Sequence, residues 1–243
     1  MCPIKPINAL VLIPCCKQKK VTPFRRTSQP IPNILPLRTQ LLQQIQRTPV
    51  LANIPANQRG ILNPNAPLTQ SIHLYVGNFY QVTKKSLWSI LAGQYPSIHV
   101  LIVSAFYGLA KLDEGVKEYE LQMGNILHNG MKVYQFWKQN NLWQILYNYI
   151  NENNIYYVWS LLPDSMPFFP YHRVFNKLWK ILRNTQIQCF HVRVRGAGSG
   201  TGGKRAEWLV QILNTNPNYL VGMPFPPTQL RGIPNCVFHY VQC

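Results

Sequence analysis

The chain has 243 residues, 47% of them hydrophobic, and its 24 Lys and Arg against seven Asp and Glu give a formal net charge of +17. This length suits one large domain or two small ones around a buried core, and the charge predicts a polyanionic partner, most simply nucleic acid. The apolar segments are too short to cross a bilayer and the first residues lack a secretory signal, which argues against a membrane partner and favours a cytoplasmic, nucleoid-associated protein.

Apolar runs rich in β-branched residues alternate with stretches in which apolar residues recur every three or four positions. The runs predict strands at Ala9–Ile13, His99–Val103, Ile155–Leu161 and Cys189–Val194. The periodic stretches predict helices at about Thr69–Gln94, Gly130–Glu152, Arg173–Arg183 and Lys204–Leu213. This order predicts one α/β domain over residues 1–243, with a mostly parallel central sheet flanked by helices and a basic groove at the carboxyl ends of the strands.

Two Pro-rich stretches interrupt the alternation. The first, at about 22–68, is also rich in Gln and reads as an insertion. The second, at about 214–243, forms a C-terminal tail whose aromatic residues predict that it packs onto the body.

The first predicted strand ends in "PCCKQKK", which delivers two thiols and three lysines within a few residues. Lys17 and Lys19 could hold a phosphate while Cys15 packs against the ligand. The alternative is a buried small Cys followed by a solvated basic turn.

The segment "LYVGNFYQ" places Tyr75 and Phe79 around a predicted helix start. Such aromatic rings could stack on an exposed base, and the amide of Asn78 could hydrogen-bond its edge. The alternative is that these rings belong to the core.

The glycine loop "GAGSGTGGK" follows the last predicted strand and precedes a helix, with Gly198, Gly203 and Lys204 at phosphate-loop spacing. Arg205 stands where a magnesium-binding Ser or Thr would be expected, so we prefer a backbone nest for a phosphate to a nucleotide triphosphatase. Arg193 and Arg195 nearby favour a phosphate over a merely flexible turn.

Four of the seven carboxylates fall within "DEGVKEYE", at positions 113 to 120. They could form an acidic turn with internal salt bridges. A polyanion-binding protein suffers repulsion from acids near its groove, however, so Glu120 and Asp113 are candidates for a task that needs negative charge. Cleavage of a glycosidic bond is such a task, because its transition state resembles an oxocarbenium ion.

The cysteines lack C-x-x-C spacing and the histidines lack ligand spacing, so we expect no metal and no cofactor. The third predicted strand is followed by "PDSM", in which Asp164 could join a site or cap a turn.

Together the motifs resemble the bacterial peroxide-stress YaaA-like superfamily, whose pattern is a strand ending in Cys then Lys, a Leu-Tyr-x-Ser-x-x-Phe helix start, and Ser-Ala-x-Tyr-Gly-Leu followed by a Tyr-Asp pair. The matching residues here are Cys15, Lys19, Leu74, Tyr75, Phe79, Ser104, Ala105, Tyr107, Gly108, Leu109 and Tyr119, with Glu120 in the place of the Asp. The first stretch is also similar to the Pro-Cys-x-x-x-Lys motif of archaeosine synthase. The resemblance implies an α/β fold, DNA binding and kinship to proteins that handle modified bases, including antiviral DNA glycosylases.

The favoured hypothesis is a DNA glycosylase that flips a modified base from double-stranded DNA and hydrolyses its bond to the sugar. Glu120 or Asp113 would activate water or stabilise the cationic sugar, and a Lys nucleophile is the minor variant. The base pocket would comprise Cys15, Tyr75, Asn78, Phe79, Ser104 and Tyr107, and the phosphate contacts Lys17, Lys19, Arg193, Arg195, Gly198, Lys204 and Arg205. The alternatives are a non-catalytic DNA-binding protein of the oxidative-stress response and transfer to a tRNA base; no obligate protein partner is evident.

Overall fold

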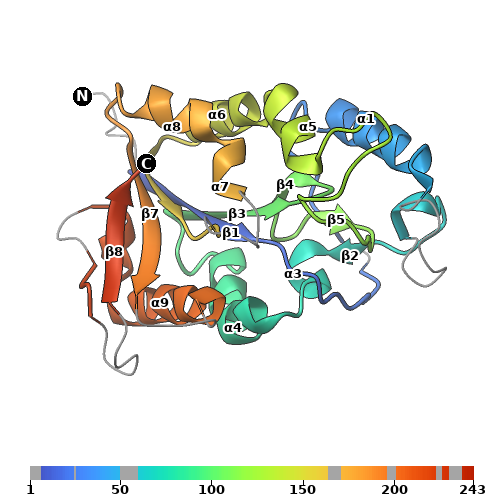
Figure 1. Cartoon of the computed structure of the whole chain (residues 1–243). Coiled ribbons are helices and arrows are strands. Elements are labelled where there is room, and N and C mark those ends of the chain that lie inside the picture. The colour runs from blue at the N-terminus through green and yellow to red at the C-terminus, as the bar shows by residue number, and fades with distance from the viewer. Residues whose placement is uncertain are drawn as a thin grey trace, which may run out of the picture.

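The computed structural model describes residues 7–24, 26–49, 60–163, 171–195, 201–222, 226–229 and 237–243. A six-stranded sheet runs through the centre of the molecule in the order β4-β3-β1-β6-β7-β8 (Figure 1). Its strands are β1 (Asn8–Pro14), β3 (Ile98–Ser104), β4 (Gly108–Lys111), β6 (Ile155–Ser160), β7 (Gln188–Arg195) and β8 (Val237–Gln242). The inner four are parallel and the two edge strands are antiparallel, which confirms the predicted α/β fold with a mostly parallel sheet.

The four predicted strands are the four parallel ones. Residues 9–13 of β1 are fully buried, as is most of β3 beside it, because helices cover both faces of the sheet and leave no polar side to alternate with. Ala9 pairs with Ile98 and Ile13 with Ile102, so the two strands end level with each other. Their carboxyl ends therefore bring Cys15 and Ser104 to the same edge of the sheet.

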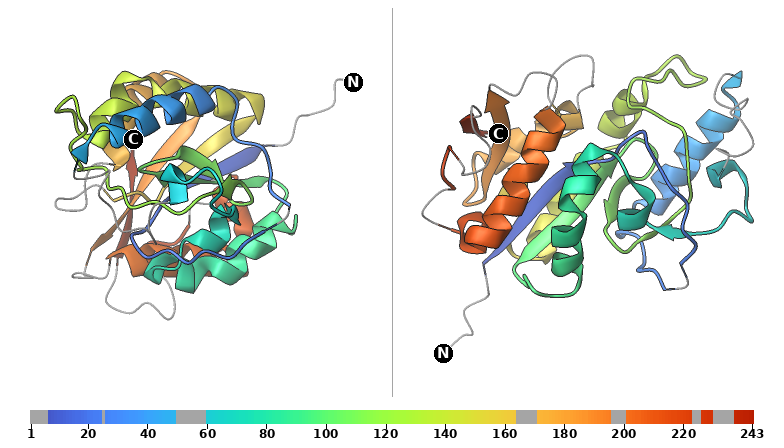
Figure 2. Two further views of the ribbon diagram at one scale, coloured as in Figure 1. Left: turned by 90° about the vertical axis from the view of Figure 1, so that its right-hand side faces the viewer. Right: turned by 90° about the horizontal axis from the view of Figure 1, so that it is seen from below.

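Two layers of helices enclose the sheet. Helices α4 (Asn78–Leu91) and α9 (Thr201–Thr215) lie side by side on one face, as the view from below shows (Figure 2). The opposite face carries α5 (Val133–Gln139), α6 (Leu142–Glu152), α7 (Tyr171–Val174) and α8 (Asn176–Leu182) (Figure 1). Among the described residues, no helix is long and apolar enough to cross a membrane.

The smaller elements gather beyond β4. They are α1 (Leu35–Gln46), the 3-10 helix η2 (Gly60–Leu62), the two-stranded ribbon of β2 (Thr69–Gln70) and β5 (Gly115–Val116), and α3 (Ser71–Leu74). Helix α1 and η2 belong to the Pro- and Gln-rich insertion. A second 3-10 helix, η4 (Pro217–Leu220), follows α9 in the tail.

The helix predicted at Thr69–Gln94 is interrupted between α3 and α4. Tyr75 leaves the helical conformation and forms a β-bridge with Lys19, and the amide of Val76 donates to the carbonyl of Gln18 at 3.1 Å. Helix α4 then restarts after Gly77, whose extended backbone forms the N-cap. The break brings the segment after β1 against the start of α4.

Two strands of the central sheet lie outside the predicted set. Strand β4 turns back from β3 after only three residues and is four residues long, too short for a periodic signal. Strand β8 comes from the Pro-rich tail and pairs antiparallel with β7. The described end of the tail thus packs onto the body by extending the sheet.

Candidate functional site

A pocket of about 770 Å³ opens where the parallel strands end. Its walls come from the segment after β1, the start of α4, the segment after β5, the segment after β6 and the start of α9. The lining residues are Pro14, Cys15, Cys16, Lys17, Asn78, Phe79, Gln81, Val82, Glu120, Leu121, Gln122, Met123, Leu161, Pro163, Tyr171, Thr201, Gly202, Gly203, Lys204, Arg205 and Glu207. This is the edge at which open α/β sheets bind ligands.

The two thiols after β1 have different surroundings. The sulfur of Cys15 lies 3.2 Å from the hydroxyl of Tyr171. Cys16 donates its thiol hydrogen to the carbonyl of Gln18 at 2.9 Å and accepts from the amide of Gly77 at 3.3 Å. Burial raises the pKa of the Cys16 thiol. Cys16 therefore holds the segment after β1 onto the start of α4, and both thiols line the pocket.

The starts of α4 and α9 contribute opposite kinds of surface to the pocket. Phe79 is buried at 7% exposure and presents an apolar wall, whereas Asn78 beside it is exposed. From α9 come Gly202, Gly203 and Lys204, and the ammonium of Lys204 forms an ion pair with Glu207 one turn later at 2.8 Å. Helix N-termini carry partial positive charge, so this end of the pocket favours anionic groups.

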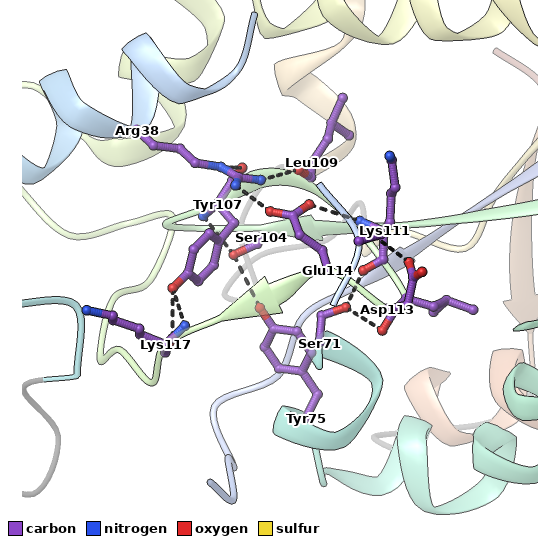
Figure 3. A network of polar contacts seen from close by, with 12 residues as sticks. Arg38, Ser71, Tyr75, Ser104, Tyr107, Leu109, Lys111, Asp113, Glu114 and Lys117 are labelled. Atoms are coloured by element: carbon purple, nitrogen blue, oxygen red, sulfur yellow. Dashed lines mark hydrogen bonds and ion pairs between the residues drawn. The ribbon is translucent and has the colours of Figure 1, made fainter. Parts of the chain in front are cut away.

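Two carboxylates of the acidic stretch act within the structure rather than in the pocket. Glu114 is fully buried and pairs with the guanidinium of Arg38, which also donates to the carbonyls of Tyr107 at 2.9 Å and Leu109 at 2.7 Å (Figure 3). Asp113 accepts a 2.7 Å hydrogen bond from the hydroxyl of Ser28 and does not line the pocket. Both contacts fasten the insertion to the turn after β4.

Of the other two carboxylates of the acidic stretch, Glu120 lines the pocket and Glu118 does not. Burial raises the pKa of Glu118, the charge of Lys19 lowers it, and the charge of Glu120 raises it. The backbone of Glu118 also holds the insertion, because its carbonyl accepts from the amide of Ile61 at 2.9 Å. Of the acidic cluster, Glu120 is the member placed to reach a ligand.

A cluster of hydroxyl groups lies buried under the sheet edge. The hydroxyl of Tyr119 lies 2.8 Å from that of Ser104 and 3.0 Å from that of Tyr75. The Ser104 hydroxyl accepts from the amide of Tyr107 at 3.0 Å. Burial raises the pKa of the tyrosine hydroxyls well above the ordinary value. Tyr75, Ser104 and Tyr107, which sequence reasoning assigned to the base pocket, therefore lie behind the lining, where they fix the turn between β3 and β4.

The predicted phosphate contacts divide into two groups. Lys17, Lys204 and Arg205 line the pocket, although Arg205 is buried and donates to the carbonyl of Val192 at 3.0 Å. Three others do not line the pocket. The ammonium of Lys19 lies 4.3 Å above the ring of Tyr119, and Arg193 and Arg195 are exposed on β7. Gly198 and Asp164 lie outside the described residues.

Several residues that line the pocket were not identified as site residues from the sequence. Leu121 and Met123 follow Glu120 and supply apolar surface, and Val82 lies one turn into α4. Tyr171, the partner of Cys15, opens α7 after the third parallel strand. Their position after strand ends and at helix starts was the available signal, because those places converge in an α/β sheet.

Comparison with known proteins gives one family. A family model described as "Peroxide stress protein YaaA" matches residues 10–164, which is more than half of the chain. A search of curated proteins finds no match. The matched span includes Cys15, the start of α4 and Glu120, and it ends before α9. The peroxide-stress part of the predicted resemblance is thereby confirmed, and the chain belongs to the YaaA family of peroxide stress proteins.

Proposed function

We propose that the chain is a DNA glycosylase, which receives a flipped and modified base in the pocket and hydrolyses its bond to deoxyribose. The observation that carries the proposal is that Glu120 lines the same pocket as Cys15, Asn78 and Phe79. A carboxylate, an amide and an aromatic face around one cavity match what removal of a base requires.

The size and chemistry of the pocket support a base as its occupant. About 770 Å³ lies in the range of pockets that enclose whole small molecules, so it leaves room for a base with a bulky substituent. Phe79 and Val82 offer apolar surface to the faces of a ring, and the buried Met123 and Leu161 lie behind the wall. The exposed amide of Asn78 supplies both a donor and an acceptor for a base edge.

Glu120 would perform the chemistry. Its carboxylate would take a proton from a water molecule as the water oxygen bonds to C1′ of the sugar, while the bond from C1′ to the base nitrogen breaks. The negative charge would also stabilise the oxocarbenium-like transition state. Lys17 and Lys204 lie on the pocket wall, where they would hold the phosphates on either side of the flipped nucleotide.

A second candidate is a non-catalytic DNA-binding protein of the peroxide response. It is favoured by the net charge of +17 together with membership of a peroxide stress family. In this case the pocket would hold no reacting base, and Glu120 would contribute nothing measurable beyond its surroundings.

Glu120→Gln separates the two candidates. The protein is incubated with unmodified and phage-modified DNA, and free base and alkali-labile sites are measured alongside DNA affinity. A glycosylase loses about 10²- to 10⁴-fold in rate, as expected for removal of a general base, with affinity retained. Glu152→Gln, at the end of α6 and exposed, serves as the matched control. Release of base from neither substrate by the unaltered protein would leave the binding protein, and a preference for RNA would point to base exchange in tRNA.

A further inference from the structure

An aromatic patch lies on the surface outside the pocket. Phe24 is 39% exposed, and its ring stacks on that of His73 with centroids 5.1 Å apart and planes inclined by 24°. His73 in turn meets the edge of Trp88 from α4 at 4.9 Å. Leu68 is 43% exposed, and its carbonyl accepts from the amide of Phe24 at 3.0 Å. We refer to Phe24, Leu68, His73 and Trp88 as the Phe24 patch.

The Phe24 patch is joined to the pocket by one extended segment of chain. This Lys17–Phe24 segment begins with a residue of the pocket wall and runs beside residues 68–76. Backbone hydrogen bonds run in both directions between the two segments. The amide of Lys20 donates to the carbonyl of Leu74 at 2.8 Å, and the amide of Val76 donates to that of Gln18 at 3.1 Å. These hydrogen bonds hold the Lys17–Phe24 segment in place between the pocket and the Phe24 patch.

The charge along the Lys17–Phe24 segment is positive. Lys17 and Lys20 are exposed, and Lys84 on α4 is exposed near His73. The charge of Lys19 lowers the pKa of Glu118, so the carboxylate of Glu118 partly offsets the positive charge of Lys19. Burial and the charge of Lys84 lower the pKa of His73, which keeps that ring neutral at pH 7 behind Phe24. An apolar ring flanked by ammonium groups is complementary to a base flanked by phosphates.

The distance fits a short strand. Seven residue steps span at most about 25 Å, which equals about seven stacked nucleotides at the B-form rise of 3.4 Å, and fewer when the strand is stretched. The patch offers only two exposed apolar side chains, too little for a stable protein interface of about 800 Å² per partner. A nucleic acid strand is the occupant that both charge and size favour.

We propose that single-stranded DNA leaving the pocket follows the Lys17–Phe24 segment and stacks one unpaired base on Phe24. The inference rests on the DNA-binding part of the proposed function and is independent of base release. Phe24 is held in place by His73, so little conformational freedom is lost when a base stacks on it. The protein would then require an unpaired stretch beside its target base.

The test measures affinity for labelled single strands of thymidine nucleotides by fluorescence anisotropy. Phe24→Ala should weaken binding of a strand of about ten nucleotides by about 5- to 150-fold, as expected for loss of one stacked base. It should leave a strand of two nucleotides unaffected, because that strand is too short to reach from the pocket even when it is stretched. Phe24→Tyr should restore the affinity, and Lys20→Gln should reduce the magnitude of the salt slope by about 0.7, the value for one phosphate on a single strand.

Tyr156→Ala is the matched control, because Tyr156 is 38% exposed and lies near the start of β6, at the opposite end of the sheet. It should bind as the unaltered protein does, and thermal unfolding should show that all the variants are folded. Equal affinity of Phe24→Ala and the unaltered protein for the longer strand, or an equal loss in Tyr156→Ala, would overturn the proposal. If the unaltered protein releases no base while binding still depends on Phe24, the glycosylase proposal fails and this one stands.

Discussion

Replacement of Arg38 by Met tests whether the insertion is an integral part of the domain. Arg38 is 6% exposed and its partner Glu114 is fully buried, so the variant leaves a carboxylate in the interior without its counter-charge. Loss of one partner of a buried ion pair costs about 3–5 kcal/mol. The carbonyls of Tyr107 and Leu109 also lose their donor, at about 1 kcal/mol each. The free energy of unfolding should therefore fall by about 5–7 kcal/mol.

The assay is urea unfolding followed by circular dichroism. A loss of this size could unfold the protein, so Arg38→Lys gives a milder measurement: it keeps the charge, loses the two carbonyl contacts, and should cost about 2 kcal/mol. Arg38→Met combined with Glu114→Gln should be more stable than Arg38→Met alone, because it removes the uncompensated charge. Arg47→Met, exposed at the end of the same helix, should change stability by less than about 0.5 kcal/mol. A cost below about 1 kcal/mol for Arg38→Met, or no recovery in the double variant, would refute the reasoning.

Three further perturbations test other contacts of the fold. Tyr119→Phe removes the hydroxyl shared by Ser104 and Tyr75 and should cost about 1–3 kcal/mol in urea unfolding, whereas no loss would show that this cluster is not a stabilising unit. Gly60→Ala would bring a methyl group within 2.5 Å of the carbonyl of Glu118 and should cost about 1–3 kcal/mol, while Gly202→Ala, with open space around it, should cost nothing; equal effects would contradict this. Burial lowers the pKa of His73 and His99, so these rings hold fewer protons in the folded than in the unfolded state; the unfolding midpoint should be constant between about pH 6.5 and 8 and fall as the pH is lowered further, and His99→Gln should flatten that fall where the control His128→Gln does not.

The sheet could be predicted because its inner strands are buried on both faces. A continuous apolar run such as residues 9–13 is typical of a parallel strand in the interior of a sheet that helices cover on both faces. The edge strand β4 could not be predicted because it is only four residues long, and the break after α3 could not be predicted because it depends on a partner far away in the sequence. The local sequence predicts a helical Tyr75, whereas its β-bridge with Lys19 gives it an extended conformation.

The sequence indicated which residues lie together at the candidate site, but not what each acidic residue contacts. Residues directly after strands and at helix starts, such as Cys15, Asn78 and Lys204, meet in one pocket because the topology brings those places together. The roles of the acidic residues depend on contacts that no spacing reveals. Asp113 bonds to Ser28, 85 positions earlier, and Glu114 to Arg38, 76 positions earlier.

The walls of the pocket extend along the chain from Pro14 to Glu207. During synthesis, the first half of the cavity is therefore built long before the start of α9 leaves the ribosome. A product that terminated early, after α8 for example, would keep Cys15 and Glu120 but would lack the wall that carries Lys204. The pocket is therefore complete only in the nearly finished chain.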